Sequence, residues 1–252
     1  MIDLFSLSGR VALVTGASGG LGRHFGRVLH AAGASVALAA RRPDSVAADA
    51  AALGERAMAV ALDVTDAASI AAALDAVDAR FGPCDLLVNN AGIAATKPFL
   101  DHAEDDWDRV MDVDLRGAFV MAQAAAKRMV AAGREGAIVN IASILGMRVI
   151  PGVASYSAAK AGLIQLTRQM AVELARHRIR VNALAPGYVA TDINRDFFAS
   201  EAGQALLKRI PQRRLGTVDD LTGPLLLLAS RAGAHMTGSV VTVDGGHSVN
   251  SL

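Results

Sequence analysis

Residues 11–22 read VALVTGASGGLG, and this stretch decides the fold class. Its first four residues form a short apolar run that is typical of a buried strand, and a helical pattern follows over 21–32. Gly16, Gly20 and Gly22 stand between them. Glycine tolerates the backbone angles of a tight turn, and without a Cβ it lets an anion approach the N–H groups at the helix start. The stretch therefore predicts a phosphate-binding turn of the kind that holds a dinucleotide.

Short apolar runs alternate with helical patterns along the rest of the chain. Such strands, separated by helices, are typical of a parallel sheet that is covered on both faces. Length alone, at 252 residues, leaves two small domains open, but the pattern favours one. We predict a single α/β domain over 1–252, with a doubly wound, Rossmann-type parallel sheet and helices on both faces. Strands are expected at 11–14, 35–40, 56–62, 85–89, 137–141, 180–185 and 239–243, and helices at 21–32, 67–81, 103–131, 153–176 and 218–229.

The composition argues against several other classes of protein. A net charge of +1 gives no reason to expect nucleic acid or an anionic membrane as a partner. No uncharged stretch reaches the roughly 18 apolar residues of a membrane-spanning helix, and the first residues lack the pattern of a signal peptide. Cys84 is the one cysteine, so neither an internal disulfide nor a cysteine-based metal site is expected, and we take it for a small residue at a strand edge. The six histidines lack metal-ligand spacing; we predict no metal and a cytoplasmic protein.

The end of the second predicted strand indicates which cofactor is bound. NAD-binding folds place an acid there to accept a hydrogen bond from the ribose 2′-hydroxyl, but Ala40 stands at that point. Arg41 and Arg42 follow, and their guanidinium groups suit a 2′-phosphate. The sequence therefore favours NADP(H) over NAD(H). The alternative is that either arginine, Arg42 especially, is only a solvated charge at the strand end.

Motifs spread over nearly the whole chain resemble those of the short-chain dehydrogenases/reductases. They are Thr15-Gly16-x-x-x-Gly20-x-Gly22, Leu62-Asp63-Val64, Asn89-Asn90-Ala91-Gly92, Ser143 with Tyr156-x-x-x-Lys160, Pro186-Gly187 with Thr191, and Val243-Asp244-Gly245-Gly246. The resemblance implies an oxidoreductase that moves a hydride between NAD(P) and a ketone or secondary alcohol. It also implies cofactor contacts from Gly16, Ser18, Gly20, Leu21, Gly22, Asp63, Val64, Asn90, Ala91, Gly92, Tyr156, Lys160, Pro186, Gly187, Val189 and Thr191.

The implied catalytic set is Ser143, Tyr156 and Lys160. Tyr156 and Lys160 are four residues apart in a helical stretch, so they share a face. A nearby ammonium favours the ionised phenol, which makes Tyr156 a candidate general acid–base. We expect Tyr156 to donate a proton to the carbonyl oxygen, Ser143 to hydrogen-bond that oxygen, and Lys160 to hold the nicotinamide ribose.

One position departs from the family pattern. Where the family has an asparagine beside the active-site lysine, this chain reads Asp114-Leu-Arg-Gly117. In the family the backbone carbonyl of this residue is thought to hold a relay water, and that role survives the change. An amide donor does not survive it, because a carboxylate only accepts. We expect Asp114 to belong to the site and, by stabilising the Lys160 ammonium, to slow proton relay or move the pH optimum.

The substrate and the partners are less determined by the sequence. The chain resembles both 3-oxoacyl carrier-protein reductases and sugar or polyol dehydrogenases; we expect a ketoreductase acting on a 3-oxoacyl thioester, with the sugar or polyol dehydrogenase as the alternative. A segment at 188–215 is expected to cap the substrate pocket. Apolar side chains predicted to line that pocket are Ile144, Leu145, Met147, Ile150, Phe197 and Phe198.

Two kinds of partner are considered. An acyl carrier protein could dock on Lys127, Arg128 and Arg134, although a solvated helix face is the alternative. The resemblance implies a homotetramer, built through the two long helices and the last strand, and the alanine-rich face at 122–126 would allow close packing. A redox-silent dinucleotide sensor is a remote alternative, because it need not keep Ser143, Tyr156 and Lys160.

Overall fold

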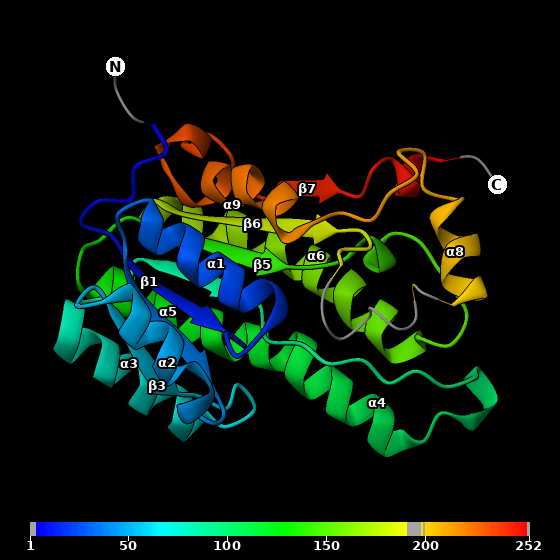
Figure 1. Ribbon diagram of the computed structural model, residues 1–252. Helices are drawn as coiled ribbons and strands as arrows, with labels where there is room; N and C mark the ends of the chain where they lie inside the picture. The colour runs from blue at the N-terminus through cyan, green and yellow to red at the C-terminus, as the bar shows by residue number, and fades with distance from the viewer. Residues whose placement is uncertain (1–3, 191–197, 199, 251–252) are drawn as a thin grey trace.

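The computed structural model describes residues 4–190, 198 and 200–250, and it contains one seven-stranded parallel sheet (Figure 1). The strand order is β3-β2-β1-β4-β5-β6-β7. The order reverses between β1 and β4, and in such sheets ligands bind outside the carboxyl ends of the strands at that point. The strands are β1 Val11–Thr15, β2 Ser35–Ala40, β3 Ala57–Ala61, β4 Leu86–Asn89, β5 Gly136–Ile141, β6 Ile179–Pro186 and β7 Val240–Val243.

Helices cover both faces of this sheet (Figure 1). One buried cluster joins the sheet to α1, α2 and α9, and another joins it to α3, α5 and α6. The α-helices are α1 Gly20–Ala31, α2 Asp44–Leu53, α3 Ala67–Phe81, α4 Glu104–Met111, α5 Ala118–Ala131, α6 Ala154–Leu174, α8 Glu201–Leu207 and α9 Thr222–Ala229. A π-helical segment, η2 Asp112–Gly117, joins α4 to α5, and short 3-10 helices are η1 Phe99–Asp101, η3 Ile144–Gly146, η4 Ala175–His177, η5 Val218–Leu221, η6 Arg231–Gly233 and η7 His247–Val249.

Strand β1 shows why the central strands are apolar throughout. Ala12 and Val14 face the cluster under α1 and α9, whereas Val11 and Leu13 face the cluster under α3 and α5. Successive side chains of a strand point to opposite faces, so a strand covered on both sides needs apolar residues at every position. The predicted fold class is confirmed.

The structure corrects several element boundaries. Two helices, α2 and α8, were not expected; α2 is rich in alanine and buries only Val46 and Ala50, so its apolar periodicity is weak. The single helix predicted over 103–131 is α4, the π-helical η2 and α5 in succession. The helix predicted over 153–176 ends at Leu174 and continues as a 3-10 turn.

Two further observations concern the core and the membrane. Cys84 is fully buried just before β4, and burial raises the pKa of its thiol to about 12, with Asp85 adding to the rise. This agrees with a packing role rather than a reactive thiol. Within the described part of the chain, no helix is both long enough and apolar enough to cross a membrane.

Candidate active site

The glycine turn between β1 and α1 has no room for side chains at two of its positions. Gly16 has φ +65, and a Cβ there would lie 2.8 Å from the Ala91 Cα. A Cβ on Gly22 would lie 2.3 Å from the Gly16 carbonyl oxygen. Gly20 also has a positive φ, at +49. The close approach of the helix start to the turn therefore depends on glycine.

The N-terminus of α1 is open to an anion. Its N-cap is Gly19, which has no side chain to bond the first N–H groups, and the first turn carries no acidic residue. Those N–H groups and the positive end of the helix dipole suit a pyrophosphate. Ser18 is exposed in the turn, while Leu21 packs against the core beneath it.

Thr15 and Asn90 fix the loop after β4 against the glycine turn. The Thr15 hydroxyl oxygen accepts the N–H groups of Asn90 at 3.0 Å and Ala91 at 2.9 Å. The Asn90 amide donates back to the carbonyls of Thr15 at 2.9 Å and Gly16 at 3.1 Å. This role of Thr15 was not predicted, although its place directly before the first glycine was the available signal.

The residues predicted to discriminate between NADP(H) and NAD(H) lie at the end of β2. The Ala17 N–H donates to the Ala39 carbonyl at 2.9 Å, which joins the glycine turn to this strand end. Arg41 and Arg42 follow directly and are both exposed. Asp63 accepts the N–H and the hydroxyl of Thr65, and these bonds, with the nearby Arg41, hold its pKa below the ordinary value.

Val64 and Gly117 bring η2 against the loop after β3. A Cβ on Gly117 would lie 2.9 Å from the Val64 Cγ2, so this contact has no room for a side chain at 117. Val64 is buried. The predicted cofactor contact at Val64 therefore also supports the π-helical segment that carries Asp114.

Ser143 and Lys160 meet at the carboxyl end of β5. Ser143 is buried and caps η3, where its hydroxyl oxygen accepts the Leu145 N–H at 3.1 Å. The η3 turn lies directly on α6, since a Cβ on Gly146 would be 2.8 Å from the Lys160 carbonyl. The Lys160 Nζ stands 5.4 Å from the centre of the Tyr156 ring. The three predicted catalytic residues are thus on adjoining elements at the edge of the sheet where ligands bind.

Asp114 forms a buried ion pair with Lys160. The Asp114 Oδ2 lies 3.1 Å from the Lys160 Nζ, and the residues are 1% and 4% exposed. Lys160 also donates to the Ile141 carbonyl at 3.0 Å, and the Asp114 Oδ1 accepts the Ile93 N–H at 2.7 Å. Burial raises the pKa of Asp114, while Lys160 and the Ile93 N–H oppose the rise. Gly92 makes room for the pair, because a Cβ there would be 2.9 Å from the Asp114 Oδ2.

Tyr188 begins the segment after β6. Pro186 ends that strand, and a Cβ on Gly187 would lie 2.6 Å from the Asp244 Cβ. The Tyr188 ring meets His247 at 5.4 Å and the edge of Phe198 at 5.7 Å. Burial raises the pKa of Tyr188, and Tyr156 adds to the rise. Val189 is buried, whereas the predicted contacts at Thr191 and Phe197 lie outside the described residues.

Arg148 is a half-buried cation just beyond the η3 turn. Its guanidinium donates to the Ser248 carbonyl at 2.9 Å, beside His247, whose pKa is lowered by burial and, in smaller part, by Arg148. Among the described residues Arg148 forms no ion pair with a carboxylate. Sequence reasoning did not single it out, because nothing in the pattern distinguishes it from a surface arginine.

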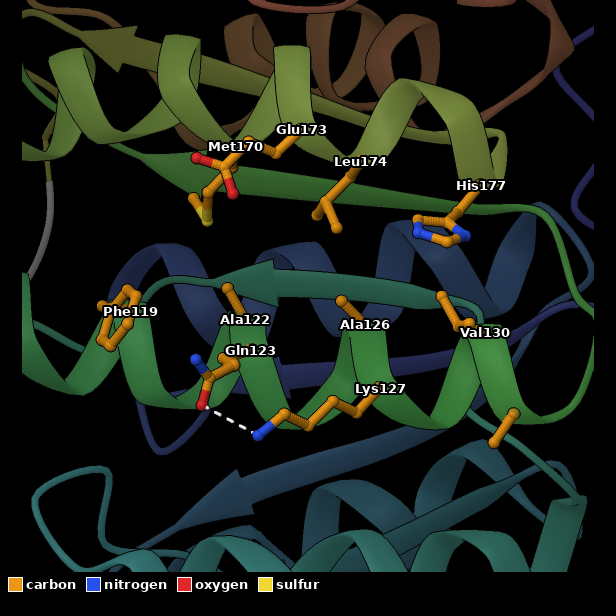
Figure 2. A pocket seen from close by; sticks show the side chains of 11 residues that line it. Phe119, Ala122, Gln123, Ala126, Lys127, Val130, Met170, Glu173, Leu174 and His177 are labelled. Carbon is orange, nitrogen blue, oxygen red and sulfur yellow. Dashed lines mark hydrogen bonds between the residues drawn. The ribbon is translucent and has the colours of Figure 1, made fainter.

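A separate groove lies between α5 and α6, and none of its lining residues belongs to the site above (Figure 2). Its volume is about 420 Å³. Apolar side chains from both helices line it, including Phe119, Met170 and Leu174. Lys127 donates to the Gln123 amide oxygen at 3.2 Å along its rim.

Fold and site together define a dinucleotide-dependent oxidoreductase. A family model described as Enoyl-(Acyl carrier protein) reductase matches residues 16–248. The chain belongs to the short-chain dehydrogenase/reductase family, whose members are NAD(P)-dependent and act on alcohol and ketone groups.

Its relatives are similar over their whole lengths. The chain is 42% identical over 248 residues to the 2-dehydro-3-deoxy-D-gluconate 5-dehydrogenase of Escherichia coli K12, with 98% of each covered. It is 40% identical to the gluconate 5-dehydrogenase of Gluconobacter oxydans, again with 98% of each covered. A crystal structure of a gluconate 5-dehydrogenase from Burkholderia cenocepacia, in complex with NADP and tartrate, superimposes with a TM-score of 0.94 at 39% identity, covering 99% of both chains. A 3-oxoacyl-[acyl-carrier-protein] reductase of Thermotoga maritima is 36% identical, covering 95% of this chain and 98% of that one.

Proposed function

We propose that this protein is an NADP(H)-dependent dehydrogenase that interconverts a secondary alcohol and a ketone on a sugar acid. The observation that carries the proposal is the full-length similarity, at 42% and 40% identity, to two enzymes of sugar acids. A 3-oxoacyl thioester, the substrate expected first from the sequence, has weaker support, because the carrier-protein reductase is 36% identical. The alternative of a sugar or polyol dehydrogenase is therefore favoured.

The basic residues that could receive an acyl carrier protein also argue against the thioester. Arg128 is paired with Asp75 and Asp78, each at 2.6 Å, and Arg134 lies 3.1 Å from Asp85. The charge of Arg128 is offset within the chain, Arg134 shares Asp85 with Arg10, and Lys127 donates to the neutral Gln123 amide. They favour a solvated, internally paired helix face over a docking surface for an acidic protein.

Each catalytic side chain has a separate role in the proposed reaction. A bound nicotinamide would supply or accept the hydride. In alcohol oxidation Tyr156 takes the hydroxyl proton as the hydride leaves the same carbon, and in reduction it returns that proton to the carbonyl oxygen. Ser143 donates a hydrogen bond to the oxygen as negative charge develops there. Lys160 holds the ribose and keeps a positive charge beside the Tyr156 phenol.

The glycine turn and the β2 end would hold the cofactor. The pyrophosphate fits the open N-terminus of α1, where side chains are excluded at Gly16 and Gly22. At the end of β2, two exposed arginines and no acid favour a 2′-phosphate, which supports NADP(H).

Arg148 supports a substrate that carries a carboxylate. A half-buried guanidinium that has no acidic partner within 4–190, 198 and 200–250 suits a bidentate carboxylate contact. It follows the Ser143 turn directly and reaches η7, which carries His247, and the His247 ring contacts Tyr188. We propose that Arg148 binds the acid group and that the 188–215 segment caps the sugar chain.

A cofactor-coupled absorbance assay tests this function. Purified protein is offered NADP+ with a panel of aldonic acids and neutral polyols, and NADPH with 3-oxoacyl thioesters. We expect oxidation of at least one sugar acid, at a kcat/KM well above that for any polyol or thioester. Turnover of thioesters alone would overturn the proposal. The Tyr156→Phe variant, assayed in parallel, controls for contaminating dehydrogenases.

We also propose that the α5/α6 groove is covered by a second copy of the chain, within the homotetramer implied by the family. Phe119 and Val130 on this face are 42% and 41% exposed, and Lys127 and Glu173 on its two sides offer opposite charges. Light scattering of the wild type and of Phe119→Asp measures the assembly. We expect a smaller particle for Phe119→Asp only; Leu100→Asp, an exposed apolar position outside the groove, is the control.

A further inference from the structure

The Asp114–Lys160 pair places a second charge beneath the phenol of the proposed acid–base. Lys160 Nζ stands 5.4 Å from the Tyr156 ring centre and 3.1 Å from the Asp114 Oδ2. The carboxylate is held in place by its hydrogen bond from Ile93 and by the space that Gly92 leaves. Lys160 is held from the other side by the Ile141 carbonyl. The ammonium therefore faces a fixed counter-charge instead of solvent.

The other charged groups near the pair are engaged elsewhere or exposed. Elements packed against it include α4, η2, η3, α6 and the loop after β4. On α4 and that loop, Asp106 pairs with Lys97 and Arg109. On η2, Arg116 donates to the Thr65 carbonyl, and Asp112 is exposed. η3 has no ionisable side chain, and Tyr156 is the titratable group of α6 that faces Lys160.

The charge of the side chain at position 114 determines how strong an electrostatic field the cluster exerts at the Tyr156 phenol. With a neutral amide at 114, the buried cluster would carry the net charge of one ammonium; with a carboxylate, the two charges offset each other. Inside a protein such charges are poorly screened, so the difference is felt at neighbouring groups. Burial raises the pKa of Asp114, while Lys160 and the Ile93 N–H act against that rise and favour the ionised carboxylate.

We propose that Asp114 is a positioning residue that fixes Lys160 and weakens its field at Tyr156, so that alcohol oxidation reaches its maximal rate at a higher pH than an amide at 114 would allow. The kinetic half of this proposal rests on the proposed function. The electrostatic half can be measured without cofactor or substrate.

The chain has only two tyrosines, Tyr156 and Tyr188, which makes the ionisation of Tyr156 directly observable. In the full-length Tyr188→Phe protein, ring-13C-labelled Tyr156 gives a single tyrosine signal whose shift follows ionisation. Adding Asp114→Asn should move its titration midpoint about one pH unit lower, since an offsetting charge has been removed. An unchanged midpoint would overturn the proposal.

Matched variants separate charge from structure. Asp112→Asn removes an acid from the same π-helical segment at an exposed position, and it should leave the midpoint nearly unmoved. Asp114→Ser replaces the carboxylate by a neutral hydroxyl. If Asp114→Asn does not fold, this variant should show the same lowering of the Tyr156 midpoint. Adding Lys160→Met to the Asp114→Asn protein should raise the Tyr156 midpoint again, because the ammonium that favours the ionised phenol is then absent. Equal shifts for Asp112→Asn and Asp114→Asn would also contradict the proposal.

The pH–rate profile gives the kinetic readout. For Asp114→Asn, the alkaline rise of kcat for alcohol oxidation should begin about one pH unit lower than in the wild type. A purely structural role would lower the rate at every pH without moving the profile. If the wild type oxidises no alcohol but the Tyr156 midpoint still shifts, the proposed function fails and the electrostatic role of Asp114 stands.

Discussion

The glycine turn and the Asp114–Lys160 pair are two parts of one site built by opposite means. At the turn, side chains are excluded: a Cβ on Gly22 would lie 2.3 Å from the Gly16 carbonyl, and backbone N–H groups remain for an anion. At the pair, two charged side chains are buried at 1% and 4% exposure, and each also has one hydrogen bond to the backbone, Asp114 from the Ile93 N–H and Lys160 to the Ile141 carbonyl. In the function that we propose, the first region binds the cofactor by shape and backbone dipoles, and the second tunes the chemistry by charge in a poorly screened interior.

This difference affects how each region tolerates change. The turn has no room for a side chain at Gly16 or Gly22, because backbone atoms occupy the space. At the pair, removing either charge leaves the other buried without its counter-charge, which changes the local electrostatic field. The two regions should therefore separate in experiments that measure cofactor binding apart from turnover.

The largest effect on turnover is expected for a change at Tyr156, beside the Asp114–Lys160 pair. Tyr156→Phe should lower turnover about a thousand-fold, since the proton donor and acceptor is lost. NADPH affinity, followed by fluorescence titration, should change little because the glycine turn is untouched. Turnover near the wild-type rate would contradict the assigned role.

Gly22→Ala tests the glycine turn, the other region of the comparison. The added methyl group cannot fit against the Gly16 carbonyl, so we expect a loss of about 2–3 kcal/mol in unfolding free energy together with weaker NADPH binding. Denaturant melts and fluorescence titrations measure both. Gly223→Ala is the control, because nothing lies within 4 Å of a Cβ there; similar losses in the two variants would show that the turn is not special.

Arg41→Ala tests, within the cofactor region, which residue discriminates between NADPH and NADH. If Arg41 forms a charge-assisted contact with the 2′-phosphate, its loss should lower the preference for NADPH over NADH about ten- to a hundred-fold in kcat/KM. The NADH value itself should be nearly constant. Arg168→Ala, an exposed arginine on α6, should leave the preference alone. An unchanged preference in Arg41→Ala would remove this residue from phosphate recognition.

Arg148→Met should have the smallest effect. We expect KM for a sugar acid to rise about ten-fold while kcat stays within about two-fold, because a binding contact remote from the reacting atoms is removed. A neutral polyol that is also turned over provides the internal comparison, since its KM should not respond. Equal rises for both substrates would point to distortion of the pocket instead.

The predicted cofactor half of the site rests on local sequence context, whereas the catalytic half rests on residues that are far apart in the chain. Gly16, Gly20 and Gly22 follow a clear strand and precede a clear helix, so their local context sufficed. Asp114 could be flagged only as a departure from a family pattern, since its partner is 46 residues away and meets it through folding. Arg148 and Tyr188 gave no signal, because their neighbours on η7 come from the far end of the chain.

The sequence by itself determined the parallel α/β fold, because that depends on short-range periodicity, and its glycine spacing predicted a phosphate-binding turn. Its resemblance to a family pointed to Ser143, Tyr156 and Lys160 as the catalytic set. Only the tertiary structure decided that Asp114 and Lys160 are buried as a 3.1 Å pair, that a π-helical segment carries Asp114 there, and that Arg148 lacks an acidic partner among the described residues. Burial and charge pairing are properties of packed elements, and no local pattern specifies which distant side chains will share a low-dielectric space.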